Sequence, residues 1–173
     1  KKEFGVDVDN LWLPDVFGYS AALPQILKLA EIDYFLTQKI SWNQFNDFPF
    51  QTFNWRGIDG TEILTHFPPE NTYNSELDTK FIMPAQETFK EKDKLNEFMS
   101  LFGVGDGGGG PKPENIEMGK RINNLEGAPK VSFDTAKNFF KRLNKNKSIL
   151  ETWVGELYLE LHRGTLTTHG LVK

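Results

Sequence analysis

The order of apolar and polar positions divides the chain into short strands and helices. Apolar residues at positions 8–13 predict a strand that ends at Pro14, which cannot donate to a β-ladder. Ser20 is a suitable N-cap for a helix whose apolar positions recur at helical spacing, and residues 34–38 predict a second strand. Because strand, helix and strand follow closely, they form a βαβ unit, and we expect the two strands to be parallel.

The middle of the chain has a different pattern. Residues 52–58 and 61–67 form two β-like arms around Asp59 and Gly60, the dipeptide that suits a two-residue type I′ hairpin turn. Two prolines end the second arm. We expect this hairpin to be an excursion from the main sheet.

Alternation of helices and strands resumes in the second half. The pattern predicts helices at residues 84–98, from Pro113 to Gly127 and after an Asp134 cap, and strands at residues 101–104, 130–133 and 153–161. At least four strands alternating with helices favour an α/β fold with a parallel sheet in one domain. The pattern leaves open whether the sheet closes into a barrel.

Composition excludes several classes of function. The chain has 173 residues, 25% of them charged, a net charge of −4 and scattered basic residues, so we expect no nucleic-acid partner. No apolar stretch reaches 18 residues, which predicts no membrane span. The absence of Cys excludes disulfides and thiolate metal sites. Aromatic residues make up 13%, which fits either a rich core or a sugar-binding surface.

Polar residues follow several of the predicted strands. In parallel α/β folds, sites form at the carboxyl ends of the strands. Those ends carry Asp15, Gln38 with Lys39, Asp106, and Glu160 with His162. An Asp in the position of Asp15 is often a turn or cap residue, but Ser20 is the better cap, which leaves Asp15 available to the rim.

Two further patterns each allow two interpretations. Glu156, Glu160 and His162 alternate along the last predicted strand, where they line a polar cavity or face solvent on an edge. The glycine run at 105–111 lacks the Gly-Lys-Ser/Thr of a phosphate loop and the GxGxxG of a dinucleotide loop, which argues against nucleotide binding. It is a flexible loop or a place where a ligand approaches the backbone, with Asp106 as a sugar ligand or an acid.

Several long segments resemble one known family. Residues 11–27, 35–43, 57–60, 65–69, 105–111 and 153–165 are similar, in this order, to segments of class II α-mannosidases, glycoside hydrolase family 38. The likeness is greatest to the cytosolic branch, vacuolar in yeasts. It implies that residues 1–173 are the C-terminal portion of the catalytic domain, part of a seven-stranded parallel β/α barrel with an inserted β-hairpin. The implied reaction removes terminal α-linked mannose from oligosaccharides with retention of configuration.

The resemblance also implies residue roles and a cofactor. Asp15 matches the nucleophile, which is also a ligand of zinc or, in some members of this branch, cobalt. Asp106 is the candidate acid/base, with Glu156 as the alternative. The expected substrate-binding residues are Trp12, Phe17, Lys39, Glu156, Glu160 and His162.

The chain also departs from the family pattern. The family's other metal-binding motifs match no residues between 1 and 173, so His162 is not assigned as a ligand, and we expect the chain alone to be inactive. A non-catalytic carbohydrate-binding fragment or subunit is the alternative. The expected partners are mannose-containing oligosaccharides, with a homo-oligomer left open. The expected location is cytoplasmic, or vacuolar for a yeast-like source.

Overall fold

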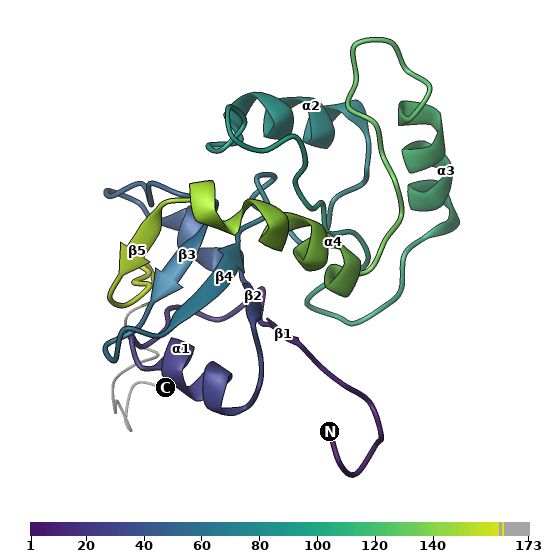
Figure 1. Cartoon of the computed structure of the whole chain (residues 1–173). Coiled ribbons are helices and arrows are strands. Elements are labelled where there is room, and N and C mark those ends of the chain that lie inside the picture. The colour runs from purple at the N-terminus through teal and green to yellow at the C-terminus, as the bar shows by residue number, and fades with distance from the viewer. Residues whose placement is uncertain (163, 165–173) are drawn as a thin grey trace.

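A five-stranded sheet forms the centre of the molecule (Figure 1). A computed structural model describes residues 1–162 and 164. In spatial order, the strands are β1 (Asn10–Trp12), β2 (Tyr34–Leu36), β4 (Glu62–His66), β3 (Thr52–Arg56) and β5 (Thr152–Val154). The fold is therefore mixed α/β, and the described residues form five strands rather than the seven of a closed barrel.

The sheet contains two strand directions. β1, β2 and β4 run parallel to one another, whereas β3 is antiparallel to β4 and β5 is parallel to β3. The carboxyl ends of β1, β2 and β4 therefore lie at one edge of the sheet. The parallel pairing of β1 and β2 confirms the predicted βαβ unit. The expectation that the hairpin leaves the sheet is wrong: β3 and β4 are almost fully buried, and each pairs with a partner on its outer side.

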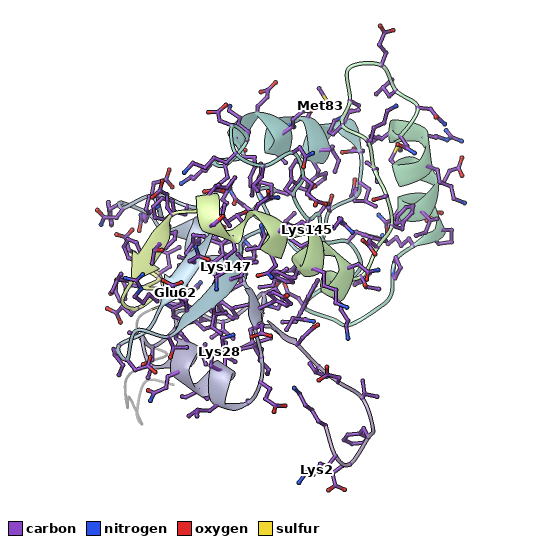
Figure 2. The ribbon with its side chains drawn as sticks, in the orientation of Figure 1. Lys2, Lys28, Glu62, Met83, Lys145 and Lys147 are labelled. Atoms are coloured by element: carbon purple, nitrogen blue, oxygen red, sulfur yellow. The ribbon has the colours of Figure 1, made fainter. Side chains whose placement is uncertain are left out.

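The two faces of the sheet are covered by different helices. Successive residues of a strand point to opposite faces, so Phe35 and Leu36 enter two separate apolar clusters. Leu27 of α1 (Leu23–Leu29) packs in the first cluster, and α4 (Ala136–Leu143) contributes Phe139 and Phe140 to the second. Much of the aromatic content thus belongs to the core. Charged side chains lie outside, such as those of Lys28 on α1 and Lys145 after α4 (Figure 2).

Local capping decides where the remaining helices begin. α2 spans Thr79–Thr88 and contains Pro84, so the predicted helix at 84–98 starts and ends too late. The Asp78 carboxylate caps α2 by accepting from the amides of Lys80 and Phe81, a signal stronger than the apolar pattern. The other helices are η1 (Lys39–Trp42), α3 (Pro113–Ile122) and η2 (Asn144–Ile149).

Three predicted strand features are wrong. Residues 101–104 and 130–133 do not join the sheet; the first forms isolated bridges from Phe102 to Ser75 and from Val104 to Gly109. β5 ends at Val154 because the chain turns at Gly155, where φ is +116°. The hairpin turn is not type I′, because Gly60 has a positive φ and Asp59 does not.

Across the described residues, the helices are too short or too polar to cross a bilayer.

Candidate active site

Three parallel strands deliver polar residues to one edge of the sheet. Asp15 follows β1, Lys39 opens η1 directly after β2, and the loop after β4 carries Tyr73. The sequence predicted the first two positions from the strand ends. The third is seven residues beyond β4, where no periodicity marks it.

The Asp15 carboxylate is paired with a buried cation. Lys39 Nζ lies 2.9 Å from Asp15 Oδ1, and the Lys39 side chain is 6% exposed while that of Asp15 is 51% exposed. The same ammonium lies 3.4 Å from the centroid of the Trp42 ring and 5.2 Å from that of Tyr73. Lys39 is thus held between two aromatic rings with its charge directed at Asp15, a cation–π arrangement that orients the ammonium.

Tyr73 lies beside both predicted catalytic carboxylates. Its hydroxyl donates to Asp106 Oδ1 at 2.9 Å, and its ring centroid lies 5.2 Å from the Lys39 ammonium that pairs with Asp15. Burial, the bond to Asp106 and the negative charge of Asp15 raise the pKa of Tyr73 to about 12, so the phenol keeps its proton at neutral pH. The structure therefore brings together Asp15 and Asp106, although Asp106 arrives on a loop and not at the end of a sheet strand.

The glycine run packs against this tyrosine at its first residue. A Cβ on Gly105 would lie 2.2 Å from Tyr73 Cε2, and the Gly105 amide donates to Asn74 Oδ1 at 2.6 Å. Gly107 has open space around its would-be Cβ. The start of the run is therefore close-packed against Tyr73, whereas a Cβ on Gly109 would meet Val104 Cβ at 3.0 Å. Asp106 itself has a left-handed φ of +57°.

A cavity of about 780 Å³ opens beside Tyr73. Trp12, Pro14 and Gly105 line it, close in sequence to Asp15 and Asp106, which are not themselves lining residues, and most of segments 96–104 and 129–136 completes it. Trp12 is 43% exposed, so its ring offers an apolar surface at this opening. The volume is within the usual range of small-ligand sites, about 300–1,000 Å³.

The other predicted substrate-binding residues form two separate groups. Phe17 and His162 stack on each other with ring centroids 4.7 Å apart, and Phe17 and Glu156 line a second hollow of about 490 Å³. Glu160 binds a neighbouring loop: its carboxylate accepts from the amides of Phe45 and Asn46 and from the Asn46 side chain, which lower the pKa of Glu160 to about 2.

The expectation that Glu156, Glu160 and His162 share one face of a strand is wrong. Beyond Gly155 the chain leaves the sheet: Leu157 forms an isolated bridge with Tyr19, and the Asn43 side chain bonds to the backbone of Tyr158 and Glu160. The alternating pattern arises because Leu157 and Leu159 insert into the core.

The described residues do not provide a complete metal site. Nowhere in residues 1–162 do three His, Asp or Glu side chains gather closely enough to hold an ion. Asp15, the ligand expected from the resemblance, faces the Lys39 ammonium. The described residues therefore do not fit zinc or cobalt by themselves, and no step of the reaction derived for this site depends on a metal.

Sequence reasoning missed Tyr73 and the role of Trp42. Tyr73 lies just beyond the conspicuous proline pair at 68–69, which marks the end of β4 but gives no sign of a site residue after it. Trp42 lies in a segment similar to the mannosidase family, but its contacts appear only in three dimensions.

Comparison with known proteins identifies the family of the chain. A family model described as glycosyl hydrolases family 38 N-terminal domain matches residues 1–156. The chain belongs to glycosyl hydrolase family 38. It is 50% identical over 173 residues to "Alpha-mannosidase G" of Dictyostelium discoideum and 45% identical over 172 residues to "Alpha-mannosidase 2C1" of Homo sapiens. The first match covers all of this chain and the second covers 99% of it. Each match covers only 16% of the relative's own length.

A solved structure shares the fold. The α-mannosidase of Enterococcus faecalis V583 superimposes with a TM-score of 0.68 over 90% of this chain and 18% of its own, at 17% sequence identity. That likeness supports the mixed α/β architecture.

Proposed function

We propose that the full-length protein carrying this chain is a retaining α-mannosidase that removes terminal α-linked mannose from oligosaccharides. The family and the names of the relatives support the substrate class. The observation that carries the proposal is the pair of carboxylates beside Lys39 and Tyr73: Lys39 Nζ lies 2.9 Å from Asp15 Oδ1 and 5.2 Å from the Tyr73 ring centroid, and the Tyr73 hydroxyl donates to Asp106.

Retention of configuration comes from the family resemblance. Retaining glycosidases need roughly 5–5.5 Å between their two carboxyl groups, whereas inverting enzymes need roughly 6.5–9.5 Å to admit a water. Asp15 and Asp106 contact Lys39 and Tyr73, which are neighbours, and we propose that they act as the retaining pair.

The reaction follows from these two groups. The Asp15 carboxylate attacks the anomeric carbon while Asp106 gives its proton to the departing glycosidic oxygen, which breaks the C–O bond and leaves a mannosyl ester on Asp15. Water then attacks the same carbon and gives a proton to Asp106. The ester bond breaks, mannose leaves and both carboxyl groups return to their starting state.

Tyr73 and Lys39 assist in different ways. A hydroxyl has one proton, and Tyr73 donates it to Asp106 Oδ1, which leaves the other oxygen of Asp106 to carry the catalytic proton. Lys39 places a positive charge 2.9 Å from Asp15 and fixes its orientation.

Two wider parts of the proposal come from the resemblance. The sheet is part of a seven-stranded β/α barrel, and the full-length protein binds zinc or cobalt with Asp15 as one ligand. A titration of the metal-free full-length protein with each metal, followed by calorimetry of wild type and Asp15→Asn, tests the second part.

Azide rescue assigns the two carboxylates. We expect Asp15→Ala and Asp106→Ala, each in the full-length protein, to lower kcat on an unactivated α-mannoside on the order of 10⁴-fold or more. With a dinitrophenyl α-mannoside and azide, Asp106→Ala should form the α-mannosyl azide, because azide attacks the mannosyl ester on Asp15. Asp15→Ala should form the β-azide, because azide replaces the missing carboxylate.

A matched control is Asp93→Asn, an exposed aspartate in the turn after α2, which should keep wild-type turnover. Normal turnover by Asp15→Ala would remove Asp15 from the mechanism. Products of the opposite configuration would exchange the two roles.

A further inference from the structure

Two side-chain donors converge on one backbone carbonyl beneath the candidate site. Gln38 Nε2 donates to the carbonyl oxygen of Asn71 at 2.7 Å, and Trp42 Nε1 donates to the same oxygen at 3.1 Å. Asn71 has a left-handed φ of +55°, and its amide bonds back to the carbonyl of Pro68 at 3.1 Å. A left-handed residue other than glycine carries strain, so these two donors stabilise a turn that the backbone alone disfavours.

This turn determines the position of Tyr73. Only Thr72 separates Asn71 from Tyr73, whose hydroxyl contacts Asp106 and whose ring touches the glycine at position 105. A change in the Asn71 turn therefore moves the tyrosine that orients Asp106. The indole N–H of Trp42 acts on the acid/base side of the site by this route.

The face of the same indole acts on the nucleophile side. Lys39 Nζ lies 3.4 Å from the Trp42 ring centroid and 2.9 Å from Asp15 Oδ1. The Lys39 side chain is 6% exposed, so little water reaches its ammonium, and the Trp42 ring and Asp15 lie in its place. Trp42 thus reaches Asp15 through its ring and Asp106 through its N–H, along two separate chains of contacts.

We infer that Trp42 is a positioning residue that sets both catalytic carboxylates at once, Asp15 through Lys39 and Asp106 through Asn71 and Tyr73. This inference rests on the proposed α-mannosidase activity. The Trp42 ring acts on Asp15 and the Trp42 N–H acts on Asp106. Substitutions that remove the N–H alone or the whole ring can therefore separate the two effects.

Leaving-group dependence separates the two routes. A poor leaving group needs the proton from Asp106, whereas dinitrophenolate leaves without it, so only the nucleophile side limits kcat/KM for a dinitrophenyl mannoside. Trp42→Phe keeps a ring beside Lys39 but removes the N–H. We expect it to lower kcat/KM about tenfold for a methyl or disaccharide α-mannoside and less than about threefold for the dinitrophenyl mannoside.

Removal of the whole ring should affect both substrates. We expect Trp42→Leu to lower kcat/KM on the order of 100-fold for poor and good leaving groups alike, because Lys39 loses its aromatic support as well. Gln38→Met removes the other donor to Asn71 and should repeat the selective effect of Trp42→Phe. This second variant keeps the test available if Trp42→Leu fails to fold.

The matched control is Trp153→Phe in the same full-length protein. The Trp153 indole also donates to a backbone carbonyl, that of Glu156 at 2.9 Å, but away from Lys39 and Tyr73. A Trp42→Phe variant that matches this control, or that loses activity equally on both substrates, overturns the inference. An inactive wild type, or an Asp15→Ala variant with normal turnover, overturns the proposed function instead.

Discussion

His66 makes the folded chain sensitive to mild acid. Its side chain is fully buried at the end of β4, and burial lowers its pKa from 6.5 to about 3. Nε2 accepts from the amide of Met99 at 3.2 Å, so the proton is on Nδ1, which bonds to Thr52 Oγ1 at 2.9 Å. Protonation of His66 would add a proton to Nε2, which accepts from the Met99 amide. The two N–H groups would then face each other and this hydrogen bond would be lost.

The size of the effect follows from the two pKa values. Below pH 6.5 the unfolded chain binds a proton at His66 that the folded chain does not bind until about pH 3, so stability falls as the pH falls. Between pH 7 and pH 5 the loss amounts to about 2 kcal/mol, since one pH unit well inside this window costs about 1.4 kcal/mol.

The measurement compares wild type with His66→Gln in the full-length protein. Gln can accept from Met99 but does not titrate. We expect the variant to be less stable at pH 7, and the difference in free energy of unfolding of the transition that includes this domain to shrink by about 2 kcal/mol at pH 5. Parallel stability curves between pH 7 and pH 5 would refute the reasoning, because they would show that His66 titrates alike in both states.

Three other features give predictions. Burial raises the pKa of Glu70, whose carboxylate oxygens make no hydrogen bond of ordinary geometry within the described chain. The folded chain therefore loses stability as the pH rises through the raised pKa of Glu70. The melting temperature of Glu70→Gln minus that of wild type should therefore increase from pH 5 to pH 8. A difference that stays constant over this range would contradict the prediction. Glu160→Ala should speed hydrogen exchange of the two loop amides it accepts by about tenfold, while unchanged exchange would show that the loop holds without it. Gly105→Ala should lower kcat/KM by about tenfold or more by displacing Tyr73, whereas Gly107→Ala, with open space, should not; equal activities would contradict the close packing.

Local signals predicted the order of the first elements correctly but not the helix cap: the N-cap of α1 is Ala22, and Ser20 lies before it with its Oγ accepting from the Ala22 amide. Pro14 follows the first strand, Pro24 lies in the first turn of α1, and β2 is the first strand after this helix. Elements that are neighbours in sequence are therefore also neighbours in the sheet. Short connections of this kind leave few alternatives for pairing. Asp15 and Lys39 were found for the same reason, since each directly follows one of these strands.

Strand pairing over long distances was not predictable in the same way. β5 pairs with β3 although about a hundred residues separate them, and β4 inserts between β2 and β3. An apolar stretch such as residues 101–104 has the composition of a strand, but it forms only isolated bridges, to Ser75 and Gly109, outside the sheet. Its Leu101 packs with Leu36 and Phe140 instead.

The sequence by itself determined the family, the position of the candidate nucleophile and the central βαβ unit, because these depend on short contiguous segments. Only the tertiary structure decided that Tyr73 bonds to Asp106 beside the Asp15–Lys39 pair and that Trp42 contacts both Lys39 and Asn71. The bonds of Tyr73 to Asp106 and of Trp42 to Asn71 join residues about thirty positions apart, and their geometry depends on how loops after different strands meet at one edge of the sheet. Side-chain identity along the chain fixes which groups are available, and packing fixes which of them touch.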